Sequence, residues 1–187
     1  MSLEKDVLDF WFGTPESAEF GQRRQCWFVK DLEFDATIQR NFAKDFDIAA
    51  DGGHDSLAGT AEGALALIIM LDQFPRNLFR GSARSFATDA KALSLARSAV
   101  AAGHDQALNV VQRCFVYLPF EHSEELADQD ESVRLFEALG DAEFLDFAIR
   151  HRDVIARFGR FPHRNAVLGR DNTPEETAFL EQPGSSF

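Results

Sequence analysis

The groups best suited to chemistry lie in three short polar segments, residues 72–77, 119–124 and 151–165, each beside a predicted helix end. The third is the most unusual, because residues 150–170 contain six arginines, two histidines and one acid in a chain of net charge -12. A planar guanidinium forms forked hydrogen bonds with carboxylates and phosphates, so arginines without lysine indicate recognition of such a group. Alternatively, they pair with the ten acids of residues 121–146 and hold helices together.

Asp72 is a carboxylate near the end of the most apolar segment of the chain, residues 61–74. Burial and the negative end of a helix dipole both disfavour a charge there, so a cation must stabilise it. Pro75 is expected to end this helix before Arg76, so an arginine from another segment is the expected partner. The carboxylate belongs either to a buried structural ion pair or to a site in which it orients a substrate-binding arginine.

Histidines accompany the carboxylates and arginines in the other two segments. Glu121 and His122 follow a proline at a predicted helix N-terminus, where the histidine either exchanges protons near neutral pH or caps the helix. His151 continues an apolar helical face and is expected on the buried side, where a histidine is often a satisfied core residue. His163 and Arg164 lie in a turn rich in glycine and proline, and such loops often carry function.

Several other classes of site and partner are disfavoured. The histidines lack the spacing of metal ligands, and neither a glycine-rich phosphate loop nor a Gly-x-Ser-x-Gly turn occurs, so no metal and no cofactor is predicted. Cys26 and Cys114 form no disulfide framework. The acidic balance disfavours nucleic acid and anionic membranes as partners. With no signal peptide and no long apolar run, the chain is expected to be cytoplasmic.

The elements that must position these groups are helices. Apolar residues recur at helical spacing and nowhere alternate for long enough to predict a sheet. The predicted fold is all-α, a compact array of antiparallel helix pairs with seven to nine helices in a single domain over residues 1–187. The apolar segment 61–74 is expected to be a central helix, and Pro75 and Pro119 are expected to end helices. Further helices are predicted within residues 7–12, 15–28, 34–46, 89–102, 106–118, 123–139 and 141–158, and after Thr173.

Taken together, the three polar segments resemble the bacterial domain-of-unknown-function 924 family. The motifs are Asp72-Gln-Phe-Pro-Arg-Asn77, Pro119-Phe-Glu-His-Ser-Glu124 and the residues from His151 to Asn165. The resemblance extends from residues 7–13 to the terminal residues 182–187. It implies an all-helical fold similar to tetratricopeptide-type arrays, and it implies no established activity, substrate or cofactor. Two of the motifs also share Phe-Pro followed by Arg-Asn, which indicates two similar helix-ending turns.

We expect the three segments to converge on one polar pocket. Its predicted acid–base and orienting groups are Asp72, Glu121, His122 and His151, and its predicted ligand-binding groups are Arg76, Asn77, Arg152, Arg160, His163 and Arg164. One hypothesis is a protein, with or without catalytic activity, that binds a small molecule bearing a carboxylate or phosphate. The alternative is a tetratricopeptide-like scaffold for proteins or peptides, in which the polar residues form a structural ion-pair network. The sequence leaves the oligomeric state open.

Overall fold

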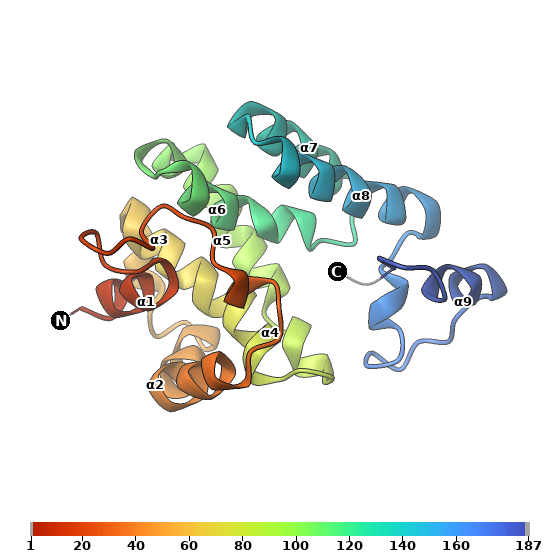
Figure 1. Cartoon of the computed structure of the whole chain (residues 1–187), viewed down its shortest axis with the longest axis horizontal. Coiled ribbons are helices and arrows are strands. Elements are labelled where there is room, and N and C mark those ends of the chain that lie inside the picture. Colours follow the sequence, from red (N-terminus) through yellow and green to blue (C-terminus); the bar gives the residue numbers. More distant parts are fainter. Residues whose placement is uncertain (1, 186–187) are drawn as a thin grey trace.

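Helices follow one another through residues 2–185, the part of the chain that the computed structural model describes, and no strand occurs there (Figure 1). The predicted all-α class is therefore confirmed. Residues 1, 186 and 187, which include the end of the terminal motif, lie outside the described residues. The α-helices are α1 (Leu3–Phe12), α2 (Leu32–Ala50), α3 (Ala61–Ile68), α4 (Phe74–Leu78), α5 (Asp89–Ala101), α6 (Val110–Glu121), α7 (Leu126–Leu139), α8 (Ala142–Phe158) and α9 (Pro174–Leu180).

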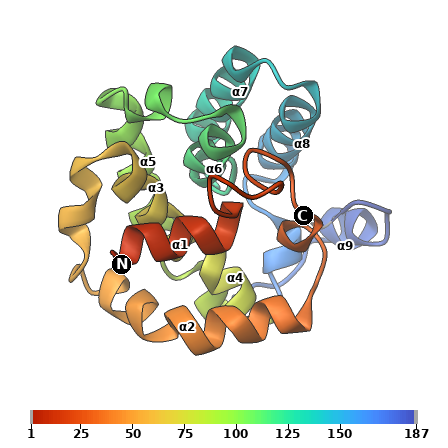
Figure 2. The same cartoon turned by 60° about the vertical axis from the view of Figure 1, so that its left-hand side comes forward.

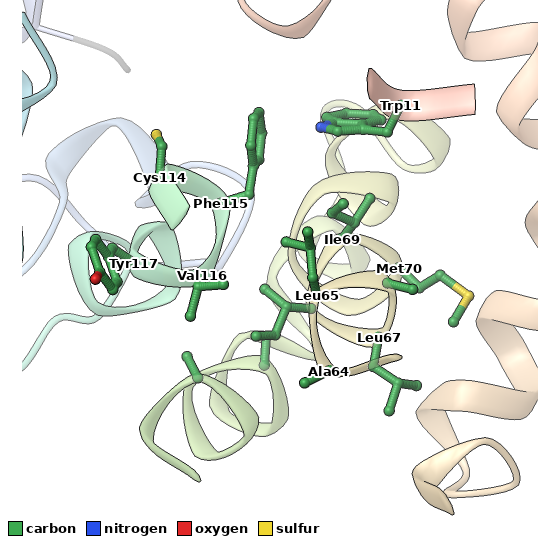
Figure 3. Packing of buried hydrophobic residues seen from close by; sticks show 14 of the residues in the cluster. Trp11, Ala64, Leu65, Leu67, Ile69, Met70, Cys114, Phe115, Val116 and Tyr117 are labelled. Atoms are coloured by element: carbon green, nitrogen blue, oxygen red, sulfur yellow. The ribbon is translucent and has the colours of Figure 1, made fainter. Parts of the chain in front are cut away.

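The apolar helix α3 lies inside a ring of other helices (Figures 1 and 2). Its sequence requires this position, because Leu65, Leu67 and Ile68 together cover more than one face and all are fully buried. α1, α5 and α6 pack against it. In Figure 3 the rings of Trp11 of α1 and Phe115 of α6 lie across from each other beside the central helix, and their centres are 5.6 Å apart.

The central helix does not end at Pro75, so that prediction was wrong. α3 passes through one π-helical turn, Ile69–Gln73, directly into α4, whose first turn contains the proline. Proline is tolerated in a first turn, but it has no N–H to donate to the carbonyl of Leu71, four residues earlier. The hydroxyl of Thr88 donates to that carbonyl instead, at 2.5 Å. Thr88 precedes α5 as expected, yet its side chain completes the central helix rather than capping α5.

A second proline, Pro119, also lies within a helix rather than after one. α6 continues past it to Glu121, and His122 is the C-terminal cap. Tertiary packing outweighs the loss of one backbone hydrogen bond, because Phe115 and Phe120 on either side are buried. Glu121 and His122 therefore lie at the end of a helix and not, as predicted, at the start of one.

The α-helix expected over residues 15–28 does not form, and the segment consists of turns and one short 3-10 helix, Gln25–Trp27. Its side chains donate hydrogen bonds to the carbonyls of the last turn of α1. Arg24 donates to the carbonyls of Phe10 and Trp11 at 2.7 and 2.8 Å, and the indole N–H of Trp27 donates to Trp11 at 3.1 Å. These bonds satisfy carbonyls that a helix C-terminus leaves unpaired, so tertiary contacts override the local helix signal.

α7 and α8 form an antiparallel pair, and α9 lies beyond them at the C-terminal end (Figure 1). α8 ends at Gly159, whose φ of +68° favours glycine. After it, Phe161 forms a small second apolar cluster with Val154 and Ile155. The tetratricopeptide-like arrangement and the single-domain organisation stay predictions. Within residues 2–185, no helix has both the length and the hydropathy required to cross a bilayer.

Thr88→Val should lower the free energy of unfolding by about 1–3 kcal/mol, the cost of leaving the buried Leu71 carbonyl without a donor. Urea denaturation measures this change. Thr37→Val is the matched control, because the Thr37 hydroxyl also donates to a helix carbonyl, that of Glu33, but does so at the surface. The control should stay within about 0.5 kcal/mol of the parent protein. Equal stabilities of the two variants would contradict the role of Thr88.

Candidate functional site

Asp72 is the centre of the candidate site. It sits in the π-helical turn, and its carboxylate is completely buried. His122 Nδ1 lies 2.7 Å from one carboxylate oxygen, and the Gln73 amide donates to the other at 2.5 Å. Burial alone would raise the pKa of Asp72, but the charges of His122 and Arg76 and these hydrogen bonds lower it to about 2. Asp72 is therefore ionised at neutral pH.

Arg76 is one of the cations that stabilise Asp72, so the expectation that Arg76 is not its partner was wrong. Because the helix continues through Pro75, the four-residue spacing brings Arg76 Nη1 to 3.6 Å from the Asp72 carboxylate. Arg76 also donates to the backbone carbonyl of Asp72. The same guanidinium donates to both oxygens of Asp89, at the start of α5, over 3.1 and 3.2 Å.

Asp89 brings a second arginine, Arg164, to the same place, with Arg164 Nη1 3.4 Å from Asp89 Oδ2. The sequence did not single out Asp89, because an acid in the first turn of a helix is common. The signal that could have found it is the repeated Phe-Pro and Arg-Asn pattern, whose two arginines meet on this carboxylate. Burial raises the pKa of Asp89, and the charge of Arg76 opposes that rise. We name Asp72, Arg76, Asp89, His122 and Arg164 the arginine–carboxylate cluster.

Aromatic rings lie against Arg164. Its guanidinium carbon is 4.6 Å from the centre of the Phe86 ring and 4.5 Å from that of Phe161. The side chain is only 8% exposed, and burial together with the charge of Arg76 lowers its pKa to about 10, so it remains cationic at neutral pH. Its Nε is buried and has no hydrogen-bond acceptor among the described residues. Arg164 is thus less completely paired than Arg76.

A second pair, Glu121 and His151, adjoins the cluster. His151 Nδ1 donates to the Phe147 carbonyl at 2.8 Å and lies 3.2 Å from Glu121 Oε1. Burial lowers the pKa of His151 to about 3, while burial and the charge of Asp72 raise the pKa of Glu121 to about 8. At neutral pH the pair is therefore largely a protonated acid beside a neutral imidazole. The ring centres of His122 and His151 are 6.5 Å apart.

His163 is the third histidine at the site. It precedes Arg164, and its ring centre is 5.5 Å from that of Phe161. Burial and the charge of Arg164 lower its pKa to about 4. Burial and the charge of Arg76 likewise lower the pKa of His122, although its carboxylate partner opposes the change. The three histidines are therefore mostly neutral at pH 7, and the two carboxylates of the cluster are balanced by its two arginines.

Besides Glu121, His151 and His163, which adjoin the cluster, three predicted site residues lie outside it: Asn77, Arg152 and Arg160. Each is paired with a carboxylate elsewhere, namely Asp35 at 2.7 Å, Asp130 at 3.2 Å and Glu176 at 2.6 Å. For Arg152 the reason is helix geometry, because it follows His151 by one residue and so lies about 100° further around α8. The buried face holds His151, and Arg152 is exposed.

The side chains of the cluster are mostly buried. Two cavities, of about 510 and 230 Å³, lie elsewhere, one between α1 and the start of α6 and the other beside α8 and α9. The cluster instead reaches solvent through the side chains of Arg76, Asp89 and His122, which are 22, 17 and 14% exposed. Among residues 2–185, no group of three or more histidine, cysteine or acidic side chains is arranged to hold a metal ion.

The chain belongs to a bacterial protein family of unknown function, DUF924, whose model matches residues 7–184. A protein of unknown function from Agrobacterium tumefaciens has a similar solved structure. The two share 42% sequence identity and a TM-score of 0.87, over 96% of this chain and 97% of that chain. No curated protein matches the chain. The family resemblance of the three polar segments is thus confirmed, and it assigns no ligand or reaction.

Asp72→Asn should lower the free energy of unfolding by about 3–5 kcal/mol, because Arg76 loses one of its two carboxylates within a buried network. Asp45→Asn is the control, since it removes a partly exposed carboxylate that also lies beside a histidine, His54. The control should cost no more than about 1 kcal/mol. Chemical denaturation compares the two. Near-parent stability of Asp72→Asn would contradict the view that the cluster stabilises the fold.

Glu121→Gln should change how stability depends on pH. The pKa of Glu121 is raised to about 8 in the folded state, so between pH 5 and 8 the folded protein holds a proton that the unfolded chain releases. Glu121 therefore makes the free energy of unfolding fall as pH rises, by at most about 1.4 kcal/mol per unit. In Glu121→Gln the free energy of unfolding should not show this fall with rising pH. In Glu62→Gln, which changes an exposed position, the fall should remain. Parallel stability profiles for parent and Glu121→Gln would refute the prediction.

Proposed function

We propose that this DUF924 protein binds a small anionic molecule at the arginine–carboxylate cluster, with His122 as the acid–base group beside the bound ligand. The observation that supports the proposal most strongly is the incomplete pairing of Arg164 in a buried site. The remaining support comes from the neighbouring histidine, whose orientation is set by a buried carboxylate.

Arg164 has hydrogen-bonding capacity that the protein does not use. Its contact with Asp89 is long, at 3.4 Å, and its Nε has no acceptor among the described residues. A buried donor without a partner costs about 1–3 kcal/mol, and more when it is charged. Proteins retain few such groups, and an acceptor supplied by a ligand removes the penalty. A carboxylate or phosphate oxygen is the acceptor that best matches a guanidinium.

His122 is suited to exchange a proton with that ligand. Its Nδ1 is bound to the ionised carboxylate of Asp72, which favours the tautomer with hydrogen on Nδ1 and leaves Nε2 as a base. Nε2 forms no hydrogen bond with another described residue. Because burial and Arg76 lower the pKa of His122, the basic form predominates at neutral pH. Asp72 would then stabilise the imidazolium formed when His122 accepts a proton.

The alternative is that the same side chains act only as a structural ion-pair network. Such a network accounts for Asp72, Arg76 and Asp89, whose charges are mutually paired. It does not account for the unmatched donor of Arg164. Anion binding that depends on Arg164 distinguishes the two functions.

Small carboxylates and phosphates, tested in a thermal-shift screen, should include at least one ligand that stabilises the protein. At about 100 times its Kd, a ligand adds about 2.7 kcal/mol, which raises the Tm of a chain of this size by roughly 5–10 °C. Arg164→Lys should weaken the shift strongly, because lysine keeps the charge but lacks the planar fork. Arg152→Ala, at an exposed arginine outside the cluster, should leave it unchanged.

The proposal fails if no anion raises the Tm, or if the shift is the same in Arg164→Lys as in the parent. Because Arg164→Lys retains a cation next to Asp89, it is expected to fold. Its circular dichroism spectrum and its Tm without ligand separate a loss of binding from a loss of structure.

A further inference from the structure

We infer that the anion is a carboxylate on a small, largely apolar molecule rather than a phosphate, an inference that rests on the proposed function and concerns the same site. The relevant feature is the way Arg164 is enclosed. The rings of Phe86 and Phe161 both lie over its guanidinium, with ring centres within 4.6 Å of the guanidinium carbon. An incoming anion therefore approaches Arg164 along the edge of the guanidinium plane that the two rings do not cover.

A carboxylate fits the edge of the guanidinium plane better than a phosphate does. Its two oxygens lie in one plane and accept parallel hydrogen bonds from a guanidinium in that plane. A phosphate carries further oxygens that project out of this plane, toward the aromatic rings. The faces of those rings are electronegative, so they repel a negatively charged oxygen.

The cluster already holds one carboxylate in this manner. Asp89 receives hydrogen bonds from both Nη atoms of Arg76, at 3.1 and 3.2 Å, one to each oxygen. Arg76 thus donates both of its forked hydrogen bonds to Asp89, a carboxylate of the protein. Arg164 makes only one long contact with Asp89. Arg164 can bind a second carboxylate without removing Asp89 from Arg76.

The charge of the site also favours a monoanion. Two carboxylates and two guanidiniums balance within the cluster, and the histidines around it are mostly neutral at pH 7. A carboxylate adds one negative charge, whereas phosphate carries up to two at neutral pH. The desolvation free energy of an ion rises steeply with its charge. Binding at this buried cluster therefore costs less for a monoanion than for a dianion.

The surroundings of Arg164 suit an apolar molecular body. Phe161 and Pro162 are buried beside it, and Phe86 is partly exposed, so its ring can cover an apolar part of a ligand near the entrance. Only small parts of Arg76, Asp89 and His122 reach solvent, with 22, 17 and 14% of these side chains exposed, and so small an exposed area suits a small molecule. Benzoate and acetate are suitable probes, with and without an apolar ring.

Isothermal titration calorimetry on the full chain tests this inference with benzoate, acetate and inorganic phosphate at equal ionic strength and neutral pH. Benzoate should bind at least about tenfold more tightly than phosphate, and more tightly than acetate. Arg164→Lys should weaken benzoate binding about tenfold or more, a difference of about 1.4 kcal/mol. Phe86→Ala should weaken benzoate binding more than acetate binding. Phe28→Ala, which removes an exposed phenylalanine outside the cluster, should change neither.

The outcomes separate this inference from the proposed function. If phosphate binds as tightly as benzoate and its binding depends on Arg164, the proposed function stands and the inference is overturned. If none of the three anions binds, the inference is overturned, and the thermal-shift screen decides the proposed function. If an anion binds equally well to Arg164→Lys, both are overturned. If benzoate binds through Arg164 but no more tightly than acetate, the preference for an apolar body is overturned.

Discussion

The buried charge of Asp72 is the constraint on which the rest of the site depends. A carboxylate without exposure to water remains ionised only when cations and hydrogen-bond donors surround it, and here His122, Gln73 and Arg76 fill that role. Each of these groups is then held in one orientation. Burial and the same charge raise the pKa of Glu121, so Asp72 affects both the geometry and the protonation of its neighbours.

The backbone near two Phe-Pro sequences positions the two arginines of the cluster. At Pro75 a π-helical turn and the Thr88 hydroxyl allow the helix to continue, and Arg76 lies one turn beyond Asp72. The second Phe-Pro sequence follows α8 and brings Arg164 to Asp89 from the opposite end of the chain. π-Helical turns are frequent at functional sites. The expectation of two similar helix-ending turns was wrong, because the first Phe-Pro sequence lies within a continuing helix and the second begins a 3-10 helix. The link between structure and proposed function is the meeting of their two arginines on one acidic group, Asp89.

What could be predicted from sequence depended on whether the signal was local. Helical periodicity was sufficient for the all-α class and for the buried face of α8 that carries His151. The effect of a proline could not be predicted, because it depends on a distant donor such as Thr88. Asp72, His122 and Arg164 were identified by residue type and do meet, whereas Arg152 points away. Asp89 was missed, since its role exists only once two arginines from remote segments have converged on it.

The central claim is that Arg164 has an unmatched donor that takes an anion, and nitrogen–hydrogen NMR of arginine side chains tests it most directly. The Nε–H resonance of Arg164 can be assigned by its disappearance in Arg164→Lys. On titration with benzoate we expect this resonance to move downfield and saturate, as a hydrogen bond to a carboxylate forms, while the Nε–H of Arg152 stays in place. An Arg164 resonance that does not change at saturating benzoate would contradict the account.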